Sequence, residues 1–534
     1  MKLYLQETNF PWQPERYHYS VEQMMLMLFP GEKPEYPETP FLPGEENSAC
    51  FTLERGEDTA TLTAQVCRSG QDASTSAQIP ACQLDDTPEK VYHVVQHALK
   101  MAFYQAGVAI LGQEPPWGAL TGVRPVKLPT RTMKAGGSYQ QAMEELQNVY
   151  HVSSVRAELA CDCAKSSLAA GAMLSEHQVS VYIGIPFCPT RCAYCSFISA
   201  DVGRSLKLVE PYLENVLEEI TCTGQVLRKN GLTVRSFYMG GGTPTTLSAQ
   251  QMDRLLTHMK EQLPLEDCIE YTVEAGRPDT ITREKLEVLK KHNIGRISIN
   301  PQTLEEHVLR AIGRCHSSQD IRAAYALARE IGFDSINMDL IAGLPQDSFE
   351  GFQRTLEGVL ELDPENITIH TLALKKGSRL MERGGTIPDG EEVARMLELS
   401  LDRLRQAGYI PYYLYRQKYM SGSLENVGWA KPGKESLYNI VMMEELQTVL
   451  SIGAGGVTKL VDTEAGKIER LPNPKYAHDY LASREKVLSQ KDEITKFYSN
   501  FCPPLMKGDL YGIPVTGNQQ AHSLRCSGIY GRVR

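Results

Sequence analysis

Between residues 178 and 375, short apolar runs alternate with longer stretches in which apolar residues recur at helical spacing. In residues 209–220, for example, Leu213, Leu217 and Ile220 fall on one helical face. The short runs predict six strands, at residues 179–185, 236–240, 271–275, 296–300, 335–341 and 366–372. Strands that alternate with helices form a parallel sheet. Because a closed eight-stranded barrel takes roughly 250 residues, we expect an open, partial (β/α)6 barrel of the TIM type.

Four of these predicted strands carry polar side chains on one face, although parallel strands covered by helices are normally apolar throughout. In RISINPQ, Ser298, Asn300 and Gln302 share one face. In three other predicted strands, the same alternation places two polar residues on one face: Asn337 with Asp339, Thr272 with Glu274, and Thr368 with His370. A polar group is costly to bury without a partner, so we expect a barrel lumen that holds a polar ligand. The alternative is a buried polar network whose members satisfy one another.

Residues 1–170 have a different pattern and predict a separate α+β domain. Residues 50–68 read as two strands around a glycine-containing turn. A helix follows, with Thr87 as its N-cap and Pro88 in its first turn. Nothing in this domain indicates a chemistry. Cys161 and Cys163 lie in a helical pattern on different faces, so we expect both to be structural.

The rest of the chain predicts a mixed C-terminal α/β extension at residues 376–500. It contains a helix and a strand within residues 390–416, a loop-like stretch at 424–440 and a glycine-rich stretch at 451–460. Residues 501–534 show no sustained period and end in basic residues, so we expect a poorly structured tail.

Composition narrows the class of protein. The chain has 534 residues, more than one core usually holds, and a formal net charge of −10. A general nucleic-acid binder should be basic, so we expect no nucleic-acid partner. No uncharged apolar run reaches the roughly 18 residues of a membrane span, and the start of the chain lacks a signal-peptide core. We therefore expect a cytoplasmic protein without membrane association, in which the 13 cysteines are reduced and any cluster of them indicates metal binding or catalysis.

Three cysteines gather in the stretch GIPFCPTRCAYCSF, directly after the first predicted barrel strand. Cys188, Cys192 and Cys195 follow the spacing Cys-x3-Cys-x2-Cys. Thiolates hold iron–sulfur clusters, and three of them leave one iron of a 4Fe–4S cluster open to a substrate or cofactor. The alternatives are a zinc loop with a distant fourth ligand and a chance grouping.

A glycine-rich stretch, YMGGGTPTTL, follows the second predicted strand at residues 238–247. Consecutive glycines allow a ligand to approach the backbone closely. The stretch falls at the carboxyl end of a strand, where barrel proteins build their sites. Glycines also form ordinary turns, so this signal is weaker than the cysteine spacing.

The cysteine stretch resembles that of the radical S-adenosylmethionine (SAM) proteins, in which an aromatic residue precedes the third cysteine, as Tyr194 does here. The stretches VYIGIPFC, GGGTPT, TVEAGRPDT, RISINPQT, IGRCHS and INMDLIAGLPQD occur in an order similar to that of the oxygen-independent coproporphyrinogen III oxidase family. With WGALTGVRPVKL upstream, the chain resembles the HemZ branch, which has its own N-terminal domain.

This resemblance implies a radical SAM barrel at residues 178–375, a 4Fe–4S cluster on Cys188, Cys192 and Cys195, and SAM on the open iron. The residues that match SAM-site positions of the family are Tyr182, Tyr194, Phe197, Gly241, Gly242, Thr243, Glu274, Gln302, Arg314 and Asp339. Without the family match, Arg314 would also read as a surface arginine.

The resemblance also implies a reaction. An electron from the cluster would cleave SAM to a 5′-deoxyadenosyl radical, which abstracts hydrogen from a substrate propionate; loss of CO2 and an electron leaves a vinyl group. Coproporphyrinogen III would become protoporphyrinogen IX, and the partners would be this anionic tetrapyrrole, a reductant and an electron acceptor. Candidates for binding the substrate carboxylates are Arg191, Lys375, Lys376, Arg379 and Arg416, each of which surface charge explains equally well.

Two positions depart from the best-known oxidases of the family: Phe197 stands where they have a further cysteine, and Gly184 where they have histidine. Phe197 is shared with a sister branch of haem chaperones, HemW, which carry a His-Asn-x-x-Tyr-Trp motif. The matching stretch here is LYNIVMM, with Tyr438 in place of the histidine. The oxidase is therefore the preferred hypothesis. A haem chaperone that uses His370 or His316 is the main alternative, and a radical SAM enzyme with another substrate is a third, because specificity lies in the site and not in the fold.

Overall fold

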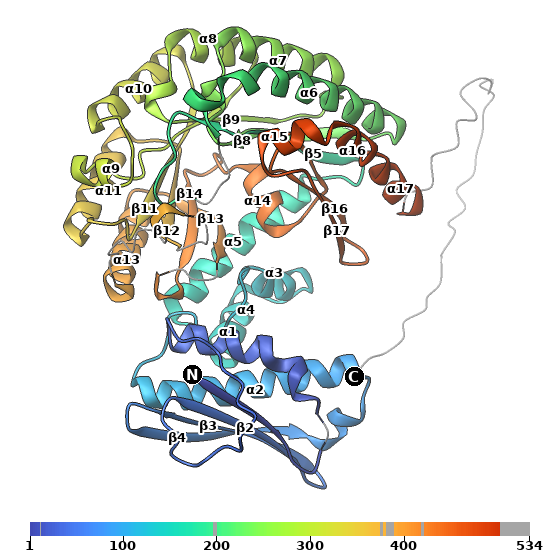
Figure 1. Cartoon of the computed structure of the whole chain (residues 1–534), viewed down its shortest axis with the longest axis vertical. Helices are drawn as coiled ribbons and strands as arrows, with labels where there is room; N and C mark the ends of the chain where they lie inside the picture. Colours follow the sequence, from blue (N-terminus) through green and yellow to red (C-terminus); the bar gives the residue numbers. More distant parts are fainter. Residues whose placement is uncertain (11, 196–199, 374–377, 381–388, 418–420, 502–534) are drawn as a thin grey trace, which may run out of the picture.

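The computed structural model describes residues 1–501, except residues 11, 196–199, 374–377, 381–388 and 418–420. Two large sheets organise the described chain, one of four strands near the N-terminus and one of eleven strands in the barrel region. Figure 1 shows them as two bodies, with helices α3, α4 and α5 between them. The tail expected at residues 501–534 lies almost entirely outside the described residues.

The first sheet has the order β1-β2-β3-β4, and its strands are β1 (Lys2–Glu7), β2 (Ser48–Arg55), β3 (Thr59–Arg68) and β4 (Gln71–Pro80). The two strands expected in residues 50–68 are β2 and β3. Ser69 and Gly70, both with positive φ, make the two-residue turn from β3 to β4. Helices α1 (His18–Leu28) and α2 (Pro88–Leu111) pack their apolar stripes against this sheet and close a hydrophobic core.

The chain between the two sheets packs on the barrel side. Helices α4 (Tyr139–Glu144) and α5 (Ser154–Ala172) contribute buried side chains to the core of the barrel region, and α3 (Lys127–Lys134) packs partly buried side chains against it. Glu425 of the large sheet pairs with Arg156 at 2.9 Å and accepts a hydrogen bond from Trp117 Nε1 at 2.7 Å. The expected division of the chain near residue 170 stays a prediction. Burial in α5 raises the pKa of Cys161 to about 12, which disfavours the reactive thiolate and supports a structural role.

The middle of the large sheet is the expected partial barrel. Its parallel strands are β5 (Gln178–Ile185), β8 (Thr233–Gly241), β9 (Glu270–Gly276), β10 (Arg296–Ile299), β11 (Ser335–Ala342) and β12 (Asn366–Thr371), in that spatial order. The helices between them are α6 (Val202–Lys229), α7 (Ala249–Gln262), α8 (Arg283–Lys291), α9 (Glu306–Ala311), α10 (Ser318–Ile331) and α11 (Phe349–Leu362), which form the outer arc in Figure 1. This arrangement confirms the fold class predicted from the alternating pattern.

The C-terminal region extends this sheet at both edges. Strands β14 (Glu425–Ala430) and β13 (Ile410–Arg416) follow β12 in antiparallel pairing, while β15 (Val449–Ile452) lies parallel to β5 and is followed by β16 (Val457–Asp462) and β17 (Lys467–Pro472). Helices α13 (Gly390–Gln406), α14 (Leu437–Glu444), α15 (Ala477–Ala482), α16 (Arg484–Ser489) and α17 (Asp492–Phe501) complete the region.

The expectation of a loop at residues 424–440 holds only for residues 424 and 431–436, because residues 425–430 form β14 and α14 begins at Leu437. Gly428 explains the error. It suggests a turn in the sequence, but it lies mid-strand against the ring of Tyr413, where a Cβ atom would come within 1.9 Å of a ring carbon. Glycine in a strand interior often marks such a close approach.

Helix α14 closes the amino end of the barrel. Glu270, at the start of β9, accepts hydrogen bonds from the backbone N–H groups of Leu437 (2.7 Å) and Tyr438 (2.9 Å). The carbonyl of Lys434 accepts hydrogen bonds from Arg296 and Asn366, the first residues of β10 and β12. The amino end of the barrel is therefore covered by protein, and a ligand site would lie at the opposite, carboxyl end of the strands.

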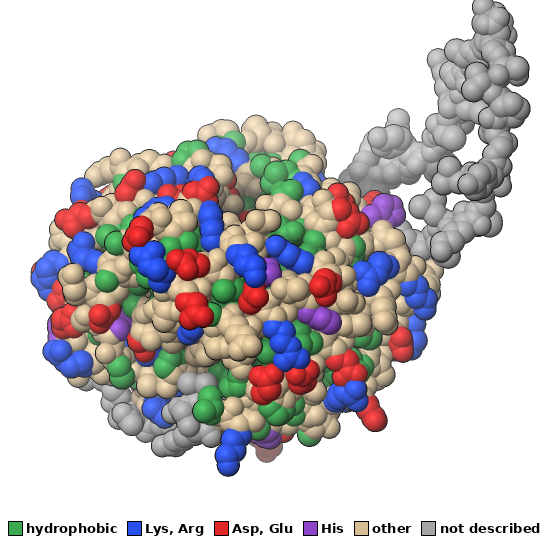
Figure 2. All heavy atoms as spheres, turned by 90° about the horizontal axis from the view of Figure 1, so that it is seen from above, with side chains coloured by type: hydrophobic (Ala, Val, Ile, Leu, Met, Phe, Trp, Pro, Cys, Tyr) green, Lys and Arg blue, Asp and Glu red, His purple; other side chains and the backbone are tan. Residues whose placement is uncertain are grey.

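The described surface carries both signs of charge. On the face drawn in Figure 2, Lys and Arg side chains are interspersed with Asp and Glu, without a large field of one sign. Among the described helices, none combines the length and the apolar character that crossing a membrane requires.

Candidate active site

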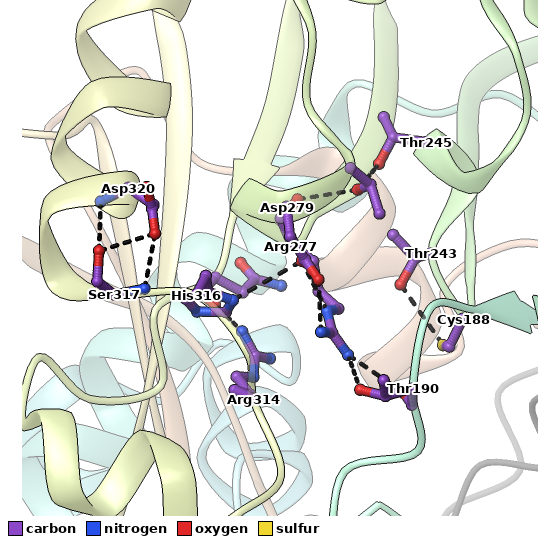
Figure 3. Close-up of polar contacts among 12 residues, drawn as sticks. Cys188, Thr190, Thr243, Thr245, Arg277, Asp279, Arg314, His316, Ser317 and Asp320 are labelled. Carbon is purple, nitrogen blue, oxygen red and sulfur yellow. Dashed lines mark hydrogen bonds and ion pairs between the residues drawn. The ribbon is translucent and has the colours of Figure 1, made fainter.

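The cysteine loop begins at the carboxyl end of β5 and is held against the end of β8. The backbone N–H of Gly242 donates to Ile185 O at 2.8 Å, and that of Thr243 donates to Phe187 O at 2.7 Å. A Cβ atom on Gly242 would lie 2.5 Å from Phe187 O. The absence of a side chain at Gly242 thus allows the backbone of the glycine-rich stretch to approach the cysteine loop closely. Thr243 Oγ1 lies 3.5 Å from Cys188 Sγ (Figure 3).

A second segment, residues 312–316 between α9 and α10, holds the other side of the cysteine loop. Ala193 donates its N–H to Ile312 O at 2.9 Å, and Arg314 donates to Tyr194 Oη at 3.1 Å. Arg314 is 6% exposed and also donates to Asn300 O at 2.5 Å, so it is not a surface arginine. Although burial opposes its charge, the neighbouring Tyr194 and Cys192 raise the pKa of the Arg314 guanidinium. A fixed positive charge therefore lies beside the cysteines.

The polar residues predicted for the lumen are brought together inside the barrel, with Glu274 on β9 and Asp339 on β11. Glu274 accepts a hydrogen bond from Tyr238 Oη at 2.6 Å, and burial raises its pKa to about 7. Burial also acts to raise the pKa of Asp339, but the nearby His370, at 3.8 Å, and a hydrogen bond from Asn337 (2.8 Å) hold that pKa below its usual range. Part of the lumen is thus a self-satisfied polar network.

Other lumen groups have no partner within the described part of the chain. They are the buried polar atoms Thr272 Oγ1, Asn300 Oδ1, Gln302 Oε1, Arg314 Nε and Tyr438 Oη. Gln302 also has a left-handed backbone (φ 66°), a conformation that is costly for a residue other than glycine and that clusters at functional sites. Buried polar groups are normally hydrogen-bonded, so these atoms fit a polar ligand such as SAM, which offers amino, carboxylate, hydroxyl and ring-nitrogen groups.

Tyr182 faces the same lumen and belongs to an aromatic stack that the sequence did not reveal. Its ring lies 6.3 Å from that of Tyr238 and 6.4 Å from that of Tyr438, and the rings of Tyr238 and Tyr438 are 4.5 Å apart. The only sequence signal for Tyr238 is its place in the alternation of β8, which puts it on the same face as Gly240. That face is turned to the lumen, because a Cβ atom added to Gly240 would contact Glu274.

Not every predicted site residue can be placed. Phe197, Lys375 and Lys376 lie outside the described residues, and the side chain of Arg379 is exposed. Arg416 is buried and donates hydrogen bonds to the carbonyls of Leu120 and Ser423, which fix it as a structural contact and correct its interpretation as a substrate ligand.

The three cysteines share one loop, and none of the cysteines in the described chain forms a disulfide. Among the described residues, no three His, Cys, Asp or Glu side chains gather closely enough to hold a metal ion. The assignment of Cys188, Cys192 and Cys195 as cluster ligands therefore stays a prediction that rests on their spacing and on their place in the fold. The donor set fits an iron–sulfur cluster, since thiolates are its usual ligands.

The titration of Glu274 gives a first prediction. A folded-state pKa near 7 against a usual value of 4.5 means that the folded protein keeps a proton that the unfolded chain loses, so stability falls as pH rises from about 4.5 through about 7. Glu274→Gln should remove this slope, which is worth up to about 3 kcal/mol. Thermal unfolding midpoints measured without SAM from pH 5 to pH 8 test it. The exposed Glu261→Gln variant should keep the wild-type slope, and an unchanged slope in Glu274→Gln would contradict the prediction.

Comparison with known proteins agrees with this architecture. The sequence profile of the Radical SAM superfamily matches residues 182–359. The chain is 40% identical to the oxygen-independent coproporphyrinogen-III oxidase-like protein HemZ of Bacillus subtilis over 76% of this chain and 82% of that protein. It is 32% identical to the heme chaperone HemW of the same organism over 52% of this chain and 69% of that protein. The structure of coproporphyrinogen III oxidase (HemN) from Escherichia coli is similar with a TM-score of 0.49 at 26% identity, over 60% of this chain and 72% of that chain.

An open (β/α)6 barrel with a three-cysteine loop after its first strand is the architecture of the radical SAM class. Within that class, the chain belongs to the family of oxygen-independent coproporphyrinogen III oxidase-like proteins that includes HemZ and HemW. Its cofactors are accordingly a 4Fe–4S cluster and SAM.

Proposed function

We propose that the chain catalyses the oxygen-independent oxidative decarboxylation of coproporphyrinogen III propionates to vinyl groups. The observation that carries this proposal is the similarity to HemZ, which extends over 82% of that protein. It reaches well beyond the matched radical SAM residues and so takes in regions outside the cofactor-binding barrel.

The polar groups of the lumen support this proposal. When bound, the cluster and SAM supply the electron transfer and the hydrogen abstraction. Arg314, whose buried guanidinium has an unpartnered Nε, is suited to an anionic group, while Glu274 and Asp339 are suited to hydroxyl and ammonium donors. Helix α14 and Tyr438 close the amino end and help to keep water from the reacting groups.

Arg379 is a described cation that is suited to a substrate carboxylate. It is exposed, and the next residue, Leu380, donates its N–H to Ala193 O of the cysteine loop at 3.1 Å. The segment that carries Arg379 therefore lies at the mouth of the candidate site.

A haem chaperone is the second candidate function, because the chain also resembles HemW over 69% of that protein. Two features of the site weigh against it. Tyr438, which stands in place of the chaperone histidine, is 4% exposed and stacks on Tyr238. His316 is buried beside Asp279, and His370 lies 3.8 Å from Asp339, so both histidines already have carboxylate neighbours.

Anaerobic turnover separates the two functions. The reconstituted protein is incubated with SAM, a reductant, an electron acceptor and coproporphyrinogen III. We expect 5′-deoxyadenosine, CO2 and protoporphyrinogen IX to form together. Failure to form them, combined with stoichiometric haem binding in a spectrophotometric titration, would overturn the oxidase in favour of the chaperone.

A further inference from the structure

An ion pair at the carboxyl end of β9 reaches directly into the cysteine loop. Arg277 donates two hydrogen bonds to Asp279, from Nε to Oδ1 at 2.9 Å and from Nη2 to Oδ2 at 2.7 Å. Its remaining nitrogen, Nη1, donates to Thr190 Oγ1 at 2.8 Å and to Thr190 O at 3.2 Å (Figure 3). Thr190 lies two residues from Cys188 and two residues from Cys192, which are both predicted cluster ligands. Arg277 therefore binds the cysteine loop between these two ligands.

The carboxylate of Asp279 also faces the segment that carries Arg314. His316 Nδ1 lies 3.7 Å from Asp279 Oδ1 and comes from the same short segment as Arg314. Thr190 also donates to Gly313 O of that segment at 3.2 Å. Figure 3 shows Asp279 between Arg277 and His316, with Arg314 beside them. The carboxylate thus joins the two segments that flank the cysteine loop.

The burial of this arrangement indicates that its geometry is specified closely. The side chains of Arg277 and His316 are 4% and 1% exposed, whereas that of Asp279 is 26% exposed. A buried guanidinium is costly unless it is paired and its hydrogen-bonding groups are satisfied. The lowered pKa of Asp279 agrees with this pairing: burial opposes it, and His316 and Arg277 more than compensate.

We propose that Arg277, Asp279 and His316, here called the loop latch, are positioning residues that set the cysteine loop in register with Arg314. Through Thr190, the latch fixes the distance between the thiols that hold the cluster and the buried cation of the SAM site. The latch rests on the proposed assignment of Cys188, Cys192 and Cys195 as cluster ligands. Its direct effect falls on SAM binding at the cluster and not on the substrate.

The test uses the full-length, anaerobically reconstituted protein and Thr190→Val, which removes the hydroxyl at nearly constant shape. The variant loses the hydrogen bond accepted from the Arg277 guanidinium and the one donated to Gly313 O. We expect iron and sulfide contents close to wild type, an affinity for SAM at least about tenfold lower, because one of the two lost hydrogen bonds involves a charged group, and a smaller SAM-induced change in the EPR spectrum of the reduced cluster. Thr190→Ser should restore the affinity and the spectrum. Asp279→Asn should produce a larger loss, because it leaves the Arg277 charge buried without its partner.

Two further variants serve as controls for the Thr190 and Asp279 variants. Glu330→Gln breaks the exposed Arg283–Glu330 pair (2.8 Å) and should change neither iron content nor SAM binding. Wild-type SAM affinity and EPR response in both Thr190→Val and Asp279→Asn would overturn the latch. A full cluster in Cys192→Ser would instead overturn the ligand assignment. None of these readouts depends on coproporphyrinogen turnover, so failure of the proposed activity is a separate result.

Discussion

Replacement of Cys192 by serine is expected to abolish the 4Fe–4S cluster and, with it, the cleavage of SAM. Cys192 is 9% exposed in the cysteine loop and is adjacent to the buried charge of Arg314. Iron–sulfur clusters are held by thiolates, and serine offers a hydroxyl in place of the thiol that supplies such a ligand. Iron and sulfide content, the visible absorption of the reconstituted protein and the yield of 5′-deoxyadenosine measure the effect, and all three should fall close to background.

Cys315 offers a matched control for this variant. It is an exposed cysteine in the 312–316 segment, next to Arg314, but outside the Cys-x3-Cys-x2-Cys spacing. Cys315→Ser should keep wild-type cluster content. A brown, iron-loaded Cys192→Ser protein would show that the ligands are wrongly assigned, and loss of the cluster in Cys315→Ser would show that the whole segment, and not the spacing, determines cluster binding.

The barrel was predictable from the sequence because each of its strands carries its own signal. β-branched runs of few residues alternate with helical periodicity, and the six predicted strands match β5 and β8–β12. Among the added edge strands, β13 was predicted together with helix α13, but β14 and β15 were not predictable in the same way. β15 has four residues and β14 contains Gly428, whose role depends on the ring of Tyr413 from a neighbouring strand. Local pattern is weak where tertiary contacts decide the structure.

The candidate site likewise has features that the local sequence predicts and features that depend on tertiary contacts. The cysteine spacing, the glycines and the polar faces of the strands are local, and the structure gathers Glu274, Gln302 and Asp339 as the alternation predicts. The latch and the tyrosine stack are not local. Arg277 and Thr190 are 87 residues apart in the chain and meet only because β9 and β5 end at the same rim of the barrel. Spacing alone provides no signal for such a pair.

A buried charge network joins the C-terminal helices to the barrel and underlies the largest expected effect on stability. Glu219 of α6 is fully buried and pairs with Lys491 at 2.7 Å. It also accepts hydrogen bonds from the backbone of Gly453 (2.8 Å), from Asn473 (3.0 Å) and from Tyr480 (2.5 Å). One carboxylate therefore links α6 with the turn after β15, the end of β17, α15 and the start of α17.

Glu219→Ala should lower the free energy of unfolding by about 3–5 kcal/mol, because it leaves the Lys491 ammonium buried without a counter-charge and its other donors unsatisfied. The midpoint of urea unfolding, followed by circular dichroism, measures the change. Replacing both members by methionine (Glu219→Met with Lys491→Met) should cost less than Glu219→Ala alone, since a buried ion pair can be exchanged for apolar side chains at little cost. The neighbouring Glu218→Ala, which removes only the exposed pair with Arg484, should leave the midpoint nearly unchanged. Equal effects of Glu218→Ala and Glu219→Ala would mean that exposure does not govern these interactions and would contradict the assigned role of Glu219.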